Sequence, residues 1–261
     1  MSKTGCDLAG IGVLVTRAEH QSAPLCELIR THGGHPIAFP ALEISGPENP
    51  EITQLQLAQL EQFDIAIFIS PNAVNHGLKM LADKTPLRRL NIAAVGKGTS
   101  RVLEQAGLTV DITPVDRFDS EALLETQELH DVKDRKIIIF RGNGGRPLLG
   151  DTLQQRGAEV VYAEVYRRCK PTAAPTELLA NWSAAVNVVT ATSIDILNNL
   201  VALLGAEGVQ KLQHTPLLVV SKRMQAHAQK MGCKSIILAE RADDQSVLKA
   251  LCSWLTTEKS P

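Results

Sequence analysis

The chain has 261 residues, of which 44% are hydrophobic and 21% charged, and its formal net charge is −1. This length accommodates one large α/β domain or two smaller ones. The near-neutral charge and the 3% aromatic content argue against a general nucleic-acid or membrane-surface binder. No apolar run reaches the roughly 18 residues of a membrane span, so none is expected.

Five cysteines stand at positions 6, 26, 169, 233 and 252, and none forms a Cys-x-x-Cys pair. Their odd number and scattered positions favour a reducing compartment with free thiols. The first fifteen residues contain one lysine and lack the charged and apolar regions of a signal peptide. We therefore expect a cytoplasmic protein whose cysteines pack as small apolar residues.

Strand patterns alternate with helix patterns along the chain. Short apolar runs typical of buried strands lie at 11–15, 37–39, 64–69, 92–95, 109–112, 137–140, 160–165, 186–190, 217–220 and 235–238. Helix patterns lie at about 25–33, 52–61, 70–81, 96–107, 147–157, 192–200, 221–232 and 243–251, and another begins at 120. Segments 40–47 and 170–175 contain prolines and are expected to be extended connectors. This alternation predicts parallel sheets with helices on both faces.

The chain consists of two similar halves of about 125 residues each. Arg17 and Arg141 each follow a strand pattern and lie 124 positions apart (141 − 17). Gly33 and Gly157 end the next helix patterns at the same offset (157 − 33). Later elements repeat at offsets of 123 to 125, which pair Ser70 with Ser193, Gly96 with Ser221 and Gly107 with Gly232. The repetition indicates a duplicated α/β arrangement.

Residues suited to bind anions gather where strand patterns give way to helix patterns. Ligands of open parallel sheets bind at the carboxyl ends of the strands, where helix N-termini offer free N–H groups and partial positive charge. The junctions carry Thr16-Arg17, Ser70-Pro71-Asn72, Gly96 to Thr99, Arg141 to Arg146, Thr192-Ser193 and Ser221-Lys222-Arg223. Plain helix capping is the alternative at any single junction. The whole set favours a site for a polyanionic small molecule.

Motifs for nucleotides and metals are weak or missing in the sequence. Gly96-x-Gly-Thr departs from the dinucleotide fingerprint, and the glycine loop at 142–145 has no phosphate-binding lysine. The seven histidines are scattered and form no metal-ligand pattern. We therefore expect no cofactor and no metal. Tyr166 ends a strand pattern, and its role in packing or in function stays open at this point.

Six segments, taken in order, resemble the uroporphyrinogen-III synthase family. They are VTR at 15–17, FISPNAV at 68–74, AVGKGT at 94–99, the strand and loop at 137–146, RGAEVVYAEVY at 156–166 and TSIDIL at 192–197. The resemblance covers about residues 11–255. It implies two flavodoxin-like α/β domains with parallel sheets, joined by a two-stranded linker where the chain crosses over and returns. Domain 1 is expected at 1–38 plus 168–261, domain 2 at 42–164, and the linkers near 39–41 and 165–167.

The resemblance also implies a cofactor-free hydro-lyase of porphyrin and haem biosynthesis. The reaction closes the linear tetrapyrrole hydroxymethylbilane, which carries eight carboxylates, to uroporphyrinogen III, with loss of water and inversion of ring D. Tyr166 matches the family tyrosine that assists departure of the hydroxyl. The substrate-binding residues expected are Thr16, Arg17, Ser70, Asn72, Gly96, Thr99, Arg141, Ser193, Ser221 and Lys222. Arg223 departs from the family pattern, which has a hydroxyl residue there.

The partner expected is therefore the polycarboxylate substrate, with no nucleic acid and no membrane. By the same resemblance the protein is a monomer that makes a transient contact with the preceding enzyme of the pathway. The alternative left open is a non-enzymatic two-domain binding protein for an anionic small molecule. A nucleotide-dependent enzyme is disfavoured by the missing motifs.

Overall fold

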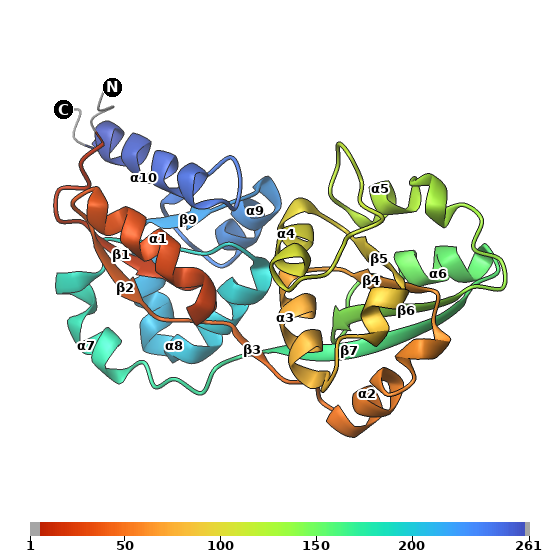
Figure 1. Cartoon of the computed structure of the whole chain (residues 1–261). Helices are drawn as coiled ribbons and strands as arrows, with labels where there is room; N and C mark the ends of the chain where they lie inside the picture. The colour runs from red at the N-terminus through yellow and green to blue at the C-terminus, as the bar shows by residue number, and fades with distance from the viewer. Residues whose placement is uncertain (1–5, 259–261) are drawn as a thin grey trace. The chain divides into compact units, whose positions relative to one another are not determined.

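The computed structural model describes residues 6–258, which form two compact α/β units (Figure 1). Of the described residues, unit 1 comprises 6–43 and 169–258, and unit 2 comprises 44–168. The chain passes into unit 2 at β3 (Glu43–Ser45) and leaves it at the end of β7 (Glu159–Cys169). Each unit has its own five-stranded sheet and its own core.

Unit 1 is built on a sheet with the strand order β10-β9-β8-β1-β2. Its strands are β1 (Gly12–Val15), β2 (His35–Ala38), β8 (Val188–Thr190), β9 (Leu217–Val219) and β10 (Ile236–Leu238). Every neighbouring pair in this sheet is parallel. Its helices are α1 (Glu19–Thr31), α7 (Thr176–Ala185), α8 (Ile194–His214), α9 (Lys222–Lys230) and α10 (Asp244–Glu258). Numbered by chain order within the unit, the strands run 2-1-3-4-5, which is the flavodoxin-like order.

Helices cover both faces of the unit 1 sheet because successive side chains of a strand point to opposite sides. Val13 and Val15 of β1 belong to a core cluster with residues of α1 and α10, such as Leu25 and Leu251. Leu14, between them, belongs to the cluster on the other face, formed with α7, α8 and α9. The continuous apolar runs of the sequence therefore correspond to strands buried on both faces.

Unit 2 has the strand order β3-β7-β6-β4-β5. Besides β3 and β7 its strands are β4 (Ile65–Phe68), β5 (Asn91–Ala94) and β6 (Lys136–Gly142). Its α-helices are α2 (Pro50–Leu57), α3 (Pro71–Met80), α4 (Lys97–Gln105), α5 (Ser120–Leu124) and α6 (Leu148–Gln155). Its 3-10 turns are η1 (Leu60–Gln62), η2 (Pro86–Arg89) and η3 (Gln127–Leu129). The pairs β4–β5, β4–β6 and β6–β7 are parallel, and the order is again 2-1-3-4-5 when β4 is counted first and β3 last.

The predicted duplication is confirmed at the helix ends. Gly33, Gly107, Gly157 and Gly232 follow α1, α4, α6 and α9, with φ of +78°, +78°, +90° and +83°. Glycine is favoured there because the left-handed region costs it nothing. The residue after each glycine bonds back to the last turn, as Leu108 N does to Leu103 O at 3.1 Å. Each sheet combines strands from both halves, since β1 lies beside β8 and the equivalent strand β6 lies beside β4.

The parallel α/β architecture is confirmed, and several elements differ from the sequence prediction. The strand expected at 109–112 is reduced to a single bridge between Ile112 and Ala93. Helix α7 was not predicted, and α8 extends beyond the predicted 192–200, with a kink at Gly205. Residues 165–167, expected as a linker, lie inside β7, where Val165 and Tyr166 are buried in the unit 2 core.

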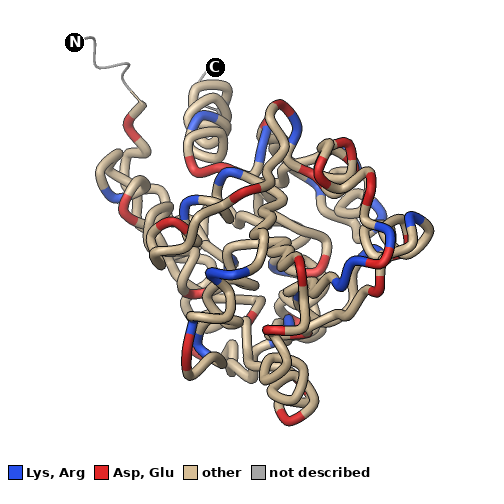
Figure 2. The backbone as a smooth tube through the Cα atoms, turned by 45° about the vertical axis from the view of Figure 1, so that its right-hand side comes forward, with Lys and Arg blue, Asp and Glu red and all other residues tan. Residues whose placement is uncertain are grey.

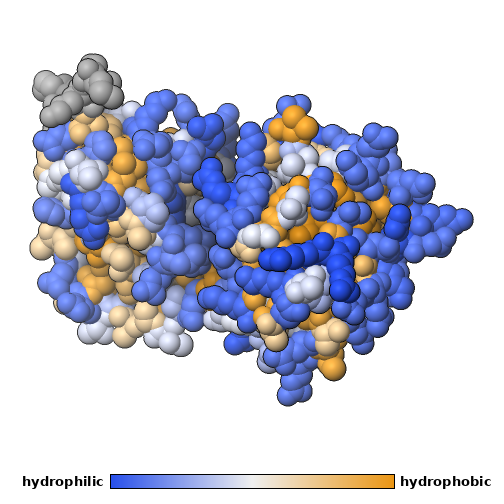
Figure 3. Space-filling view, viewed as in Figure 1, coloured by the Kyte–Doolittle hydropathy of each residue, from blue (hydrophilic) through white to orange (hydrophobic). Residues whose placement is uncertain are grey.

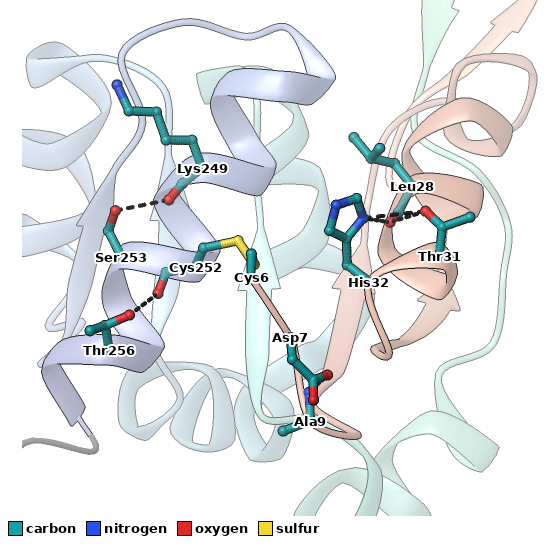
Figure 4. Close-up of a disulfide and its surroundings, with 10 residues drawn as sticks. All are labelled: Cys6, Asp7, Ala9, Leu28, Thr31, His32, Lys249, Cys252, Ser253 and Thr256. Atoms are coloured by element: carbon teal, nitrogen blue, oxygen red, sulfur yellow. Dashed lines mark hydrogen bonds between the residues drawn. A yellow bond between two sulfur atoms is a disulfide. The ribbon is translucent and has the colours of Figure 1, made fainter. Parts of the chain in front are cut away.

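The prediction that all cysteines are free thiols is wrong for two of them. Cys6 and Cys252 form a disulfide that ties the N-terminal segment to α10, with their Cα atoms 5.6 Å apart (Figure 4). The sequence concealed this pair because 246 positions separate its members and only the folding of α10 brings them together. Cys26, Cys169 and Cys233 are free. Burial raises the pKa of the Cys26 and Cys233 thiols, which suits packing residues rather than nucleophiles.

Figure 2 shows Lys and Arg interspersed with Asp and Glu along the backbone. Figure 3 shows a mostly hydrophilic face with apolar side chains exposed in places. The exposed large apolar residues are Ile52, Leu55, Val115, Phe118 and Leu238. Within residues 6–258, no helix combines the length and the apolarity needed to cross a membrane.

Candidate functional site

In unit 2, β4 and β5 end level with one another, and their neighbour β6 runs two residues further. Phe68 of β4 is in register with Ala94 of β5 and with Phe140 of β6. Two residues beyond these positions stand Ser70, Gly96 and Gly142. The strand order reverses direction at β4, because the chain proceeds from β4 to β5 on one side and β6 lies on the other side. Strand β4 is therefore the switch point of the sheet. Ligands of such sheets bind outside the carboxyl ends of the strands at this switch point.

Unit 1 repeats this arrangement at β1 and β8. Val15 is in register with Thr190, which is in register with Leu218 of β9. The segments that follow these strands carry the remaining predicted site residues, namely Thr16, Arg17, Ser193, Ser221 and Lys222. The structure thus brings the predicted residues of each unit to one edge of its sheet.

The serines at these junctions are helix caps. The Oγ atoms of Ser70, Ser193 and Ser221 accept hydrogen bonds from the backbone N–H three residues on, at 3.1, 3.1 and 3.2 Å. The caps at Ser193 and Ser221 leave the backbone N–H groups of the next two residues available to an anion, whereas Ser70 is followed by Pro71, which has no N–H. Capping and anion binding are therefore compatible at the Ser193 and Ser221 junctions.

Two predicted hydroxyl residues are buried rather than presented to solvent. Thr16 is 0% exposed, and its Oγ1 donates to the carbonyl of Thr190 at 2.5 Å, across the switch point between β1 and β8. Thr190 in turn donates to the carbonyl of Leu14 at 3.0 Å. Thr99, in the first turn of α4, is 4% exposed. The hydroxyls of Thr16 and Thr190 therefore tie the ends of β1 and β8 together.

The two predicted arginines are also held internally. Arg17 is 8% exposed; its guanidinium pairs with Asp244, the first residue of α10, and donates to the carbonyl of Ala242 at 2.6 Å. Arg141 is 7% exposed, and its guanidinium carbon lies 4.7 Å from the centre of the Tyr162 ring. Its Nε donates to the carbonyl of Gly142 at 3.1 Å. Both cations therefore fix the loops that follow β1 and β6.

The exposed cations differ between the two edges. In unit 1, Lys222 and Arg223 at the start of α9 are both exposed. In unit 2, Arg146 makes two hydrogen bonds to the carboxylate of Glu121, at 2.6 and 3.0 Å. The hydrogen bonds from Arg146 lower the pKa of Glu121. Lys222 and Arg223 are thus better placed than Arg146 to receive a carboxylate.

Tyr166 lies beneath the carboxyl edge of unit 2. It is 1% exposed, and its hydroxyl lies 3.3 Å from Ser70 Oγ. Its ring rests against the backbone of Gly142, where an added Cβ would come within 2.6 Å of ring atoms. The ring of His76, on α3, is 5.7 Å away. Asn72, in the first turn of the same helix, is partly exposed.

Sequence reasoning missed two residues at these edges. Phe118 covers Gly96 at the start of α4, with its Cβ 3.2 Å from the point where a Gly96 Cβ would be, and Lys97 Nζ lies 5.0 Å from its ring centre. The sequence could have indicated Phe118, because it is an apolar residue just before Asp119, the N-cap of α5. No sequence signal links Asp244 to its partner Arg17, because 227 positions separate the two residues.

Within residues 6–258, no group of three His, Cys, Asp or Glu residues is suited to hold a metal ion.

The fold and the two edges define a class of protein, namely a doubly wound parallel α/β protein with helix N-termini suited to an anionic ligand at each switch point.

The particular family follows from comparison with known proteins. Residues 23–249 match the family model described as uroporphyrinogen-III synthase HemD. The chain is 35% identical to uroporphyrinogen-III synthase of Escherichia coli and 33% identical to that of Salmonella typhimurium. Each alignment covers 92% of this chain and 100% of the relative. The chain belongs to the uroporphyrinogen-III synthase family.

Solved structures agree on the fold. Uroporphyrinogen III synthase from Thermus thermophilus matches with a TM-score of 0.59 at 20% identity, covering 95% of this chain and 100% of that one. The synthase from Helicobacter pylori matches with a TM-score of 0.59 at 15% identity, covering 83% and 92%.

Proposed function

We propose that the protein converts hydroxymethylbilane to uroporphyrinogen III, with loss of water and inversion of ring D, in tetrapyrrole biosynthesis. The observation that carries this proposal is the family match over residues 23–249. The arrangement of the edges supports it, because a substrate with eight carboxylates needs many anion-binding groups, and four helix N-termini follow strands at the two switch points. No residue pattern favours the alternative of a non-enzymatic binding protein.

The predicted site residues fall into two groups: those that contact the substrate, and those whose buried side chains support the strand and helix ends. We assign carboxylate binding to the N–H groups at Gly96, Ser193 and Ser221, aided by the side chains of Asn72 and Lys222. The buried side chains of Thr16, Arg17, Thr99 and Arg141 would position these N–H groups, because each is turned inward in the structure. Tyr166 is the proposed source of the proton for the leaving hydroxyl.

The enzyme must chiefly position its substrate, since hydroxymethylbilane left alone closes without inversion to isomer I. Holding the chain folded brings the substituted carbon of ring D to the reactive terminal carbon, which is catalysis by orientation. We propose a cytoplasmic monomer that receives its substrate from the preceding enzyme of the pathway.

The experiment supplies pre-formed hydroxymethylbilane to the purified protein and separates the uroporphyrin isomers after oxidation. Isomer III, absent from the control without protein, is the expected product. A binding protein would bind the polycarboxylate and leave the products at isomer I. Isomer I alone would therefore overturn the proposed enzyme activity.

A further inference from the structure

The phenol of Tyr166 is separated from solvent by Ser70. Tyr166 is 1% exposed and belongs to the core cluster beneath α3 and α4, whereas Ser70 is partly exposed at the end of β4. The tyrosine ring packs against the backbone of Gly142, where an added Cβ would lie 2.6 Å from ring atoms. A substrate at the carboxyl edge would thus meet the serine hydroxyl before the phenol.

The hydrogen-bonding capacity of the two hydroxyls sets the direction of their contact. A hydroxyl has one proton to donate and two lone pairs to accept with. Ser70 Oγ accepts from the N–H of Ala73 at 3.1 Å. Within residues 6–258, the hydrogen-bond partner of the phenol oxygen is Ser70 Oγ, at 3.3 Å. A buried phenol that did not donate would leave its O–H unsatisfied, which is costly, so Tyr166 donates to Ser70.

This assignment leaves the proton of Ser70 free. Both lone pairs of Ser70 Oγ then accept, from Ala73 and from Tyr166, so its own proton is used in neither bond. The distance of 3.3 Å is long for such a bond, and hydrogen bonds of unliganded catalytic sites commonly shorten when substrate binds.

We propose that Ser70 is the group that donates to the departing hydroxyl and that Tyr166 acts through it as the positioning residue that replaces the proton. This inference rests on the proposed function. The Ser70 proton passes to the leaving oxygen as the carbon–oxygen bond breaks, and water departs with the bonding electron pair. The phenol proton passes to Ser70 Oγ. The ring-closing step later releases a proton from a pyrrole carbon, and that proton returns to the phenolate, so atoms and charge balance.

The start of α3 supports the transient negative charge in this relay. Ser70 is the N-cap of α3, a helix of 10 residues, and the partial positive charge of its N-terminus lies next to the hydroxyl pair. Helix N-termini stabilise anions, and the effect is larger for partly buried groups. The same helix end thus serves both the serine cap and the phenolate.

A double-mutant cycle on the rate of isomer III formation tests the relay. We expect Tyr166→Phe and Ser70→Gly each to lower kcat by about 100-fold, the contribution of a positioned proton donor. Glycine at this position retains most of the helix start, so KM should stay near the wild-type value. The double variant should be no slower than the slower single variant, because two members of one relay fail together. Ser70→Thr, which restores a hydroxyl, should recover most of kcat.

The control is Tyr162→Phe, which removes the other tyrosine hydroxyl of the chain, four residues earlier on β7, and should leave kcat unchanged. If Ser70→Gly does not fold, as judged by circular dichroism, Ser70→Asn keeps a cap without a hydroxyl and takes its place. Multiplying losses in the double variant, to about 10⁴-fold, would overturn the relay, as would an unaffected Ser70→Gly or an inactive Ser70→Thr. In these cases the wild type still forms isomer III; its failure to do so would instead refute the proposed function.

Discussion

Breaking the disulfide between Cys6 and Cys252 should weaken the fold strongly. The pair closes a loop of 246 residues, nearly the whole chain, so the disulfide removes much of the conformational freedom of the unfolded state. The chain-entropy relation gives about 18 cal/mol/K for a loop of this length, or about 5.5 kcal/mol at 25 °C. Typical domains have a free energy of unfolding of only about 5–15 kcal/mol, so this is a large share.

The assay is urea denaturation of the oxidised wild type, the same protein under reductant, and the double variant Cys6→Ser/Cys252→Ser. We expect the reduced protein and the double variant to unfold at similar, much lower urea concentrations. Cys169→Ser is the matched control, since Cys169 is a free, partly exposed thiol, and should behave as wild type. A difference below about 1 kcal/mol between oxidised and reduced protein would refute the loop-entropy reasoning.

Two further predictions concern unit 2. The N–H of Lys136, with help from Arg135, lowers the pKa of Asp64, so the stability that Asp64 contributes is present above the unfolded value of about 3.9 and is lost as the pH falls through the lower pKa of the folded state. Asp64→Asn should therefore flatten this part of the acid denaturation curve, and an unchanged slope would contradict the assignment. Gly142→Ala should cost about 1–3 kcal/mol in urea denaturation, because its Cβ would overlap the Tyr166 ring. Gly46→Ala, with nothing within 4 Å, is the control and should be near neutral; equal losses would refute the packing argument.

The sequence allowed much of the fold to be predicted because local signals and the fold agree. The apolar runs became strands buried on both faces, and the glycines at 33, 107, 157 and 232 became left-handed helix ends. Ser70, Ser193 and Ser221 stand at helix starts where their side chains make the capping bonds. Each of these features depends on a few neighbouring residues, which a sequence displays directly.

Long-range features could not be predicted in the same way. The ion pair of Arg17 with Asp244 and the disulfide join residues more than 200 positions apart, and only the packing of α10 in unit 1 brings them together. Helix α7 was missed since its single fully buried residue, Trp182, gives little apolar periodicity. For the site, the sequence indicated which residues lie at the strand ends but could not indicate which of them are turned inward, as Thr16 and Arg141 are.

The most direct test of the account is the isomer composition of the product as the protein concentration rises at a fixed amount of hydroxymethylbilane. Spontaneous closure and enzymatic closure compete for the same substrate, so the fraction of isomer III should rise with protein concentration toward complete inversion. A fraction of isomer III that stays at the level without protein, at every concentration, would contradict the central claim that this chain closes the tetrapyrrole with inversion of ring D.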